Sequence, residues 1–151
     1  MSRYWLAQVP DHLLLPKLGE LNSQCRLTTA DFLAHLGEAD HRGRYLPAGY
    51  PSMYQYCVSE LNLSEGSAGK RIYAARAARQ YPAIFPAVAD GRLHLSAVVM
   101  LAPRLTPENA DELIAAASHQ SKAQIEVMLA ARFPGGGMPV RLRQPSPVDG
   151  K

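Results

Sequence analysis

The sequence predicts an all-α protein, a compact array of about seven to eight short helices, and three observations support this. Alternating apolar and polar runs of the strand type are absent. Residues that cap helices recur at short spacing along the whole chain. The 151 residues are 47% hydrophobic and 19% charged, which is enough apolar material for one buried core. We therefore expect a single helical domain that needs neither disulfides nor metals to fold.

The first two helices are predicted from apolar periodicity and helix-start residues. One covers residues 12–23 and contains Pro16. The next covers residues 29–42 and takes Thr28 or Thr29 as its N-cap. The prolines and glycine of residues 45–51 then predict a loop.

Two further helices are predicted on either side of a short break. Ser52, three residues before Gln55, forms a capping-box pattern and begins the third helix. Residues 62–64 break the apolar pattern, and Ser64 then caps a fourth helix that ends near Gln80. The pair has the outline of a helix-turn-helix over residues 52–80.

The remaining helices follow from prolines and caps. Pro82 begins a fifth helix that stops at residues 90–91. Ser96 is expected to cap a sixth and Thr106 a seventh. Ser121 with Gln124 forms a capping box that opens an eighth helix through residue 132.

The expected organisation has three parts. Residues 1–28 form an N-terminal helical extension, and residues 29–133 form the helical domain with the helix-turn-helix-like unit. Residues 134–151, rich in proline and glycine, are expected to be a flexible tail.

The charge is concentrated in the middle of the chain. The net charge is only +3, but residues 41–104 hold eight Lys or Arg against three Asp or Glu, a net charge of +5. An anionic partner such as DNA is therefore expected to contact this segment.

The second helix of the helix-turn-helix outline, from Ser64, is predicted to read the DNA major groove. Its wheel turns Ala68, Ile72 and Ala75 inward and Gly66, Lys70, Tyr73 and Ala77 outward. Lysine and arginine neutralise phosphates, whereas serine and tyrosine hydroxyls form hydrogen bonds. The predicted DNA-binding residues are Ser67, Lys70, Arg71, Tyr73, Arg76, Arg79, Arg42 and Arg44. The bland alternative is a solvated helix with ordinary basic residues.

Other chemistries are weakly indicated. His35, Glu38 and His41 lie near one another on one predicted helix, but a solvated face explains them better than a metal site. No nucleophile motif, phosphate-binding glycine loop or paired acid and base is found, so no enzyme activity, metal or cofactor is expected.

The cellular location is predicted from two absent features and from the cysteines. No apolar run approaches the 20 or so residues that span a membrane, and no secretion signal opens the chain. Cys25 and Cys57 are expected to be buried free thiols. Together these features predict a cytoplasmic protein without a membrane partner.

A different function class stays open, a protein-interaction or homodimerisation module that regulates a partner. It is suggested by the acidic N-terminal third and by the aromatic segment at residues 50–56. Aromatic side chains are common anchors at interfaces, although core packing would use them equally well.

Many segments, in the same order, resemble the N-terminal helical region of a bacterial HNH-endonuclease family. They include LSEGSAGKRI at 63–72, GRLHLS at 91–96 and LTPEN at 105–109, with further agreement at 34–40, 44–46, 50–57, 74–79, 101–103 and 121–126. In that family the nuclease motif, with paired histidines and an asparagine, lies further toward the C-terminus. The last histidine here is His119, in a helical segment, so the resemblance implies a DNA-binding helical region without nuclease activity.

A weaker resemblance in layout is to the helix-turn-helix domain of ParB-type partition proteins. It depends on the helix opened by residues 63–64, the stop at 90–91, the Leu-Ser pair at 95–96 and the last Ser-capped helix. The nucleotide-binding motifs of those proteins are missing, so the resemblance does not imply CTP chemistry.

Overall fold

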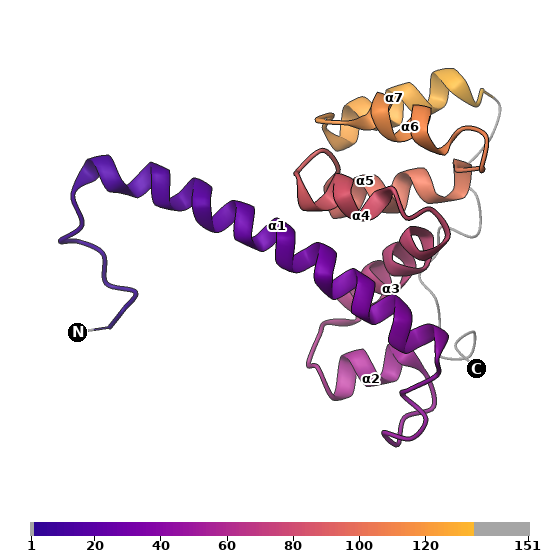
Figure 1. The fold of residues 1–151 in the computed structure, drawn as a ribbon, viewed down its shortest axis with the longest axis horizontal. Helices are drawn as coiled ribbons and strands as arrows, with labels where there is room; N and C mark the ends of the chain where they lie inside the picture. The colour runs from indigo at the N-terminus through magenta and orange to yellow at the C-terminus, as the bar shows by residue number, and fades with distance from the viewer. Residues whose placement is uncertain (1, 135–151) are drawn as a thin grey trace.

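The computed structural model describes residues 2–134, and within them the chain is all-α, as predicted. Seven α-helices and one 3₁₀ turn follow one another (Figure 1): α1 (Asp11–His41), α2 (Met53–Ser59), α3 (Glu65–Gln80), α4 (Ile84–Ala89), α5 (Leu95–Leu101), η1 (Ala102–Arg104), α6 (Ala110–Ala117) and α7 (Lys122–Arg132). The predicted tail, apart from Pro134, lies outside the described residues.

The first helix corrects two predictions. The helices expected over 12–23 and 29–42 are one continuous helix of 31 residues, α1, which crosses the domain boundary expected after residue 28. Residues 24–28 contain neither proline nor glycine, so nothing in them stops a helix. Thr28 and Thr29 are therefore interior residues and cap nothing. The array is not made only of short helices.

The centre of the fold is α3. It packs against α1, α2, α4 and α5. Its buried residues are mostly alanines on several sides of the helix: Ala68, Gly69, Ile72, Ala74, Ala75, Ala77 and Ala78. Small side chains let neighbouring helices approach closely. At Gly37 of α1, an added Cβ would stand 3.3 Å from the carbonyl oxygen of Ala75.

Three of the predicted helix caps are confirmed. The Ser52 and Ser64 hydroxyls accept hydrogen bonds from the backbone N–H groups of Gln55 and Ser67. Ser121 and Gln124 form the complete capping box of α7. Each bond satisfies an amide that the first turn of a helix leaves unpaired.

Three later starts differ from the prediction. α4 begins at Ile84, two residues after Pro82. The N-cap of α5 is His94, whose Nδ1 accepts from the N–H of Ala97, and Ser96 lies inside the helix. α6 begins at Ala110 because Thr106 and Asn109 first close a reciprocal turn, with bonds of 2.8 and 3.1 Å.

The N-terminal half of α1 stands away from the rest of the molecule (Figure 1). The first buried residue of this helix is Ala30, and the core-facing residues that follow are Leu33, Leu36 and Gly37. The body of the protein therefore surrounds only the second half of α1. Within residues 2–134, none of the helices combines the length and apolar composition that crossing a membrane requires.

Candidate interaction site

The helix predicted to read a DNA groove is enclosed by its neighbours. α2 and α3 are joined by a short turn, as in the predicted outline, but α3 packs against four other helices. Of its predicted outward residues, Gly66 is exposed, Lys70 and Tyr73 are half-buried and Ala77 is buried. The wheel prediction for Ala77 is therefore wrong, and α3 presents no continuous free face.

Two of the predicted DNA contacts are engaged within the protein. Lys70 Nζ donates a 2.8 Å hydrogen bond to Ser96 Oγ of α5. Arg71 donates to Ser67 Oγ, one turn earlier in the same helix, at 2.5 Å. These bonds connect α3 to α5 and one turn of α3 to the next.

Three predicted arginines do converge, at the C-terminal end of α1. Arg42 Nε and Arg79 Nη1 both donate to the carboxylate of Glu38, each at 2.6 Å. Arg76 holds both oxygens of Asp40 at 2.8 and 3.1 Å. We call Arg42, Arg76 and Arg79 with Glu38 and Asp40 the arginine cluster; Arg44 follows in the next, exposed turn.

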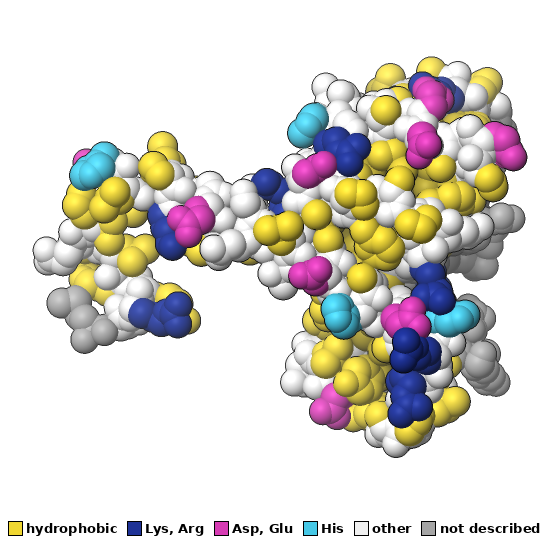
Figure 2. Space-filling model, viewed as in Figure 1, with side chains coloured by type: hydrophobic (Ala, Val, Ile, Leu, Met, Phe, Trp, Pro, Cys, Tyr) yellow, Lys and Arg dark blue, Asp and Glu magenta, His cyan; other side chains and the backbone are white. Residues whose placement is uncertain are grey.

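The ion pairs of the cluster shift the pKa values of Glu38 and Arg76. The hydrogen bond from Arg42, followed by that from Arg79, lowers the pKa of Glu38. The hydrogen bond to Asp40 raises the pKa of Arg76. Figure 2 shows Lys and Arg side chains gathered with an acidic one on the body where α1 ends and α2 lies. The cluster is positive overall, because its three arginines and neighbouring Arg44 outnumber its two carboxylates.

The largest exposed apolar surface lies at the other end of α1. Eight of the twelve exposed large hydrophobic residues among residues 2–134 fall between positions 4 and 21: Tyr4, Trp5, Leu6, Leu13, Leu14, Leu15, Leu18 and Leu21. We call residues 4–25 the arm. In Figure 2 the arm carries hydrophobic side chains while standing clear of the body. Exposed apolar surfaces of this kind are common at interaction sites.

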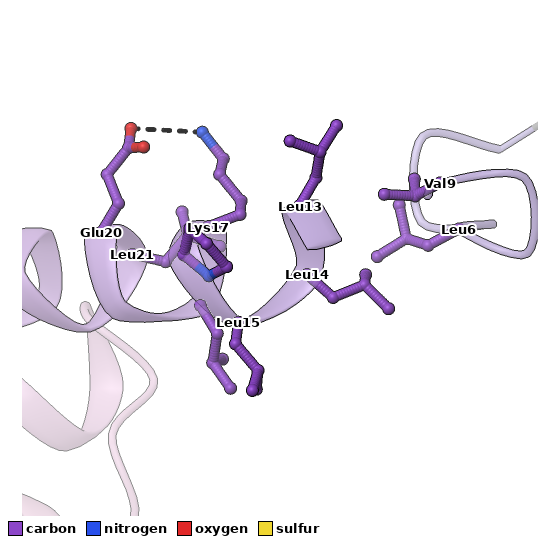
Figure 3. A pocket seen from close by; sticks show the side chains of 10 residues that line it. Leu6, Val9, Leu13, Leu14, Leu15, Lys17, Glu20 and Leu21 are labelled. Atoms are coloured by element: carbon purple, nitrogen blue, oxygen red, sulfur yellow. Dashed lines mark hydrogen bonds and ion pairs between the residues drawn. The ribbon is translucent and has the colours of Figure 1, made fainter. Parts of the chain in front are cut away.

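The turn before α1 and the helix form a shallow apolar groove of about 590 Å³. Leu14 points toward Leu6 and Val9 of that turn (Figure 3). The only ion pair drawn there joins Lys17 to Glu20, at 3.3 Å, and both side chains are exposed. The groove walls are thus almost wholly aliphatic.

The arm is a poor helix by its own propensity. Pro16 lies inside α1 and has no backbone N–H to donate. A proline in a helix interior is about 3 kcal/mol less favourable than an alanine. Gly19 adds about 1 kcal/mol, and an added Cβ there would meet nothing within 4 Å. Isolated helices of this length are marginal even with good formers. A partner that covers the arm would supply the missing stability.

The aromatic side chains of residues 50–56 contact nearby residues of the same chain. Tyr50 donates to Glu60 at 2.6 Å and Tyr54 to Glu65 at 3.2 Å. The rings of Tyr50 and Tyr56 meet edge to face, 5.3 Å apart. These half-buried side chains tie the loop before α2 to the body, so the more accessible anchors are those of the arm.

The two cysteines differ in their surroundings. Cys57 is buried as expected, and burial, aided by the nearby Asp40, raises the pKa of its thiol to about 11. Cys25 is exposed, which corrects the prediction that both thiols are buried. Its part of α1 has only begun to meet the body. Among residues 2–134 no group of three His, Cys, Asp or Glu could hold a metal ion.

Comparison with models of known protein families, with curated proteins and with solved structures gives no match to this chain. The resemblance to the HNH-endonuclease region therefore stays a prediction.

The sequence predicts a helical extension at residues 1–28, but the exposure of its leucines was not predicted. Leu14, Leu18 and Leu21 recur at spacings of four and three, which is the pattern of one helix face. Pro16 and Gly19 lie between these leucines and are poor helix formers, which weakens the helical prediction. The exposure of the three leucines could not be predicted from their spacing, because a helix packed in a core has the same pattern.

Proposed function

We propose that this chain is a non-catalytic protein-interaction module whose contact surface is the arm. The observation that supports the proposal is the group of exposed leucines on a helix that stands away from the body. Leu15 and Leu18 are 76% and 62% exposed. Covering each would contribute about 1 to 2 kcal/mol to binding, judged from the transfer of leucine side chains out of water. No catalytic group is needed for this function.

Site-specific photo-crosslinking in living cells tests this function. A photoreactive amino acid replaces Leu18 on the arm, or Leu46, an equally exposed leucine on the loop after α1. We expect protein adducts from position 18 and none from position 46. Equal labelling from both positions, or no adduct from position 18, would contradict the proposal. The mass of the adduct identifies the partner.

Binding of duplex DNA is a second candidate function, and the arginine cluster favours it. The cluster brings Arg42, Arg76 and Arg79 together at one end of α1, with Arg44 in the next turn. Its two carboxylates offset part of that charge, so contact through phosphates would be modest and independent of sequence. Lys70, Arg71, Tyr73 and Ser67 contribute less to this candidate, because they are half-buried whereas Arg76 and Arg79 of the same helix are exposed.

Titration of a fluorescent duplex in low salt tests the second candidate. Binding that falls as salt rises and weakens on Arg42→Ala with Arg79→Ala supports it. Absence of binding at about 50 mM salt, where phosphate contacts are strong, ends it.

A further inference from the structure

We propose that the partner of the arm is a second copy of this chain, with the two arms paired antiparallel as a short coiled coil. This inference rests on the proposed function of the arm and names its occupant. Leu14, Leu18, Leu21 and Cys25 are spaced four, three and four residues apart, which is the a/d pattern of a coiled coil. All four side chains are exposed, and together they form one stripe, here called the arm stripe. A stripe of this kind is complementary to a second copy of itself.

The antiparallel direction follows from where the body begins. The arm stripe continues along α1 to Phe32, which is partly buried and packs against the core of its own chain. At the C-terminal end of α1, the body therefore lies on the same side of the helix as the stripe. Parallel arms would bring two bodies to the same end and the same side, whereas antiparallel arms place them at opposite ends.

The antiparallel register that aligns the stripes pairs each a residue with a d residue. Leu18 then lies opposite Leu21 of the second copy, and Leu14 lies opposite its Cys25, so the coiled coil has four apolar layers. Lys17 faces Gln24 and Leu15 faces Asn22 at the edges. No facing pair carries like charges, so nothing at these edges opposes the pairing.

The exposed area fits a small and weak dimer interface. Four exposed leucines stand in the stripe or at its edge: Leu14, Leu15, Leu18 and Leu21. Scaling a typical leucine area by their exposed fractions gives roughly 300 Å² of apolar surface per copy. Weak, transient complexes bury less than about 1,200 Å² in total. Pairing also covers the helix segment that Pro16 and Gly19 weaken.

Sedimentation of the full chain from about 1 to about 200 µM tests the association, a range suited to a small interface. We expect a monomer–dimer equilibrium. Leu18→Glu should raise the dimer dissociation constant by at least about 100-fold, because each dimer loses two leucines and gains two charges in its centre. Leu27→Glu is the matched control: Leu27 is 55% exposed on the same helix, but nine residues on and thus on the opposite side. It should leave the dissociation constant within about twofold.

Cross-linking tests the direction. Leu14→Cys should form a disulfide with Cys25 of the second copy under mild oxidation, whereas Cys25→Ser in the same variant should abolish it. The wild type should give no disulfide dimer, because in the antiparallel register the two Cys25 residues are about 16 Å apart along the axis. Buried Cys57 does not interfere.

Each outcome decides the inference. A chain that is monomeric at every concentration, or whose dimer responds equally to Leu18→Glu and Leu27→Glu, overturns it. A Cys25–Cys25 disulfide in the wild type overturns the antiparallel direction. If photo-crosslinking at position 18 yields only adducts with a different protein, the proposed function stands and the second-copy inference fails.

Discussion

Arg76 of α3 holds Asp40 of α1 through two hydrogen bonds, and this pair joins the central helix to the end of the long one. The Asp40 side chain is only 14% exposed, so its charge depends on the arginine for compensation. Arg76 was predicted to hold DNA phosphates. Its two hydrogen bonds to Asp40 also give it a role in the fold, which the first prediction addresses.

Arg76→Ala should lower the free energy of unfolding by about 2 kcal/mol, because it leaves a mostly buried carboxylate without its partner. Urea denaturation measures the change. Arg44→Ala, at an exposed arginine four residues after Asp40, should change it by less than about 0.5 kcal/mol. Equal effects of the two substitutions would show that the Arg76–Asp40 pair contributes nothing specific.

Gly37→Val should destabilise the protein by about 2 kcal/mol, since the nearest atom to the new Cβ is a backbone carbonyl of Ala75 that cannot easily move. Gly19→Ala is the comparison on the same helix. It meets no neighbour and should increase helicity, measured by circular dichroism, with a gain of about 0.5 to 1 kcal/mol in the arm. If the Gly37→Val variant unfolds at the same temperature as the wild type, then α1 and α3 do not approach as closely as described.

The pKa of Glu38 should lie below its ordinary value of 4.5, because Arg42 and then Arg79 bind the ionised carboxylate. A lowered folded-state pKa means that this carboxylate stabilises the fold above about pH 4.5 and that the contribution disappears as pH falls through the lowered pKa. NMR titration of the carboxyl carbon measures the value. Arg42→Ala should raise it more than Arg79→Ala, and Arg132→Ala, at another ion pair, should leave it unchanged.

Glu38→Gln should strengthen any binding of duplex DNA, because it removes a negative charge from the arginine cluster. With about two phosphates neutralised, the log–log salt slope is about −1.8, so affinity would fall roughly 10-fold between 50 and 200 mM salt. The substitution should steepen the slope by about 0.9. Glu112→Gln, whose carboxylate pairs with Arg132, is the matched control for net charge. Identical gains from both variants would exclude the cluster as the site.

Cys25 should react with a thiol reagent within minutes in dilute native protein, whereas Cys57 should react only after unfolding. Burial excludes the reagent from Cys57, and its pKa of about 11 keeps it protonated near pH 8. The absorbance of the thiolate released from the reagent gives the number of reactive cysteines. Cys25→Ser should remove the fast phase, and a fast phase that persists in this variant would contradict the burial of Cys57.

Local chemistry in the sequence determined the helical class and most helix ends. Ser52, Ser64 and Ser121 begin helices as predicted because a cap depends only on neighbouring residues. The sequence also showed that the cationic residues are concentrated in the middle of the chain. It could not show that Arg76 and Arg79 reach carboxylates some 36 and 41 residues away in the chain.

Only the tertiary structure decided which helical faces are covered. Ser64 opens a helix in either case, yet whether α3 is a surface reader or the centre of the core depends on where α1, α2, α4 and α5 pack. The leucines of the arm have the spacing of a buried helix face, and they are exposed because the body ends before reaching them. Periodicity records that a face is apolar, whereas its burial depends on long-range packing, which no local pattern contains.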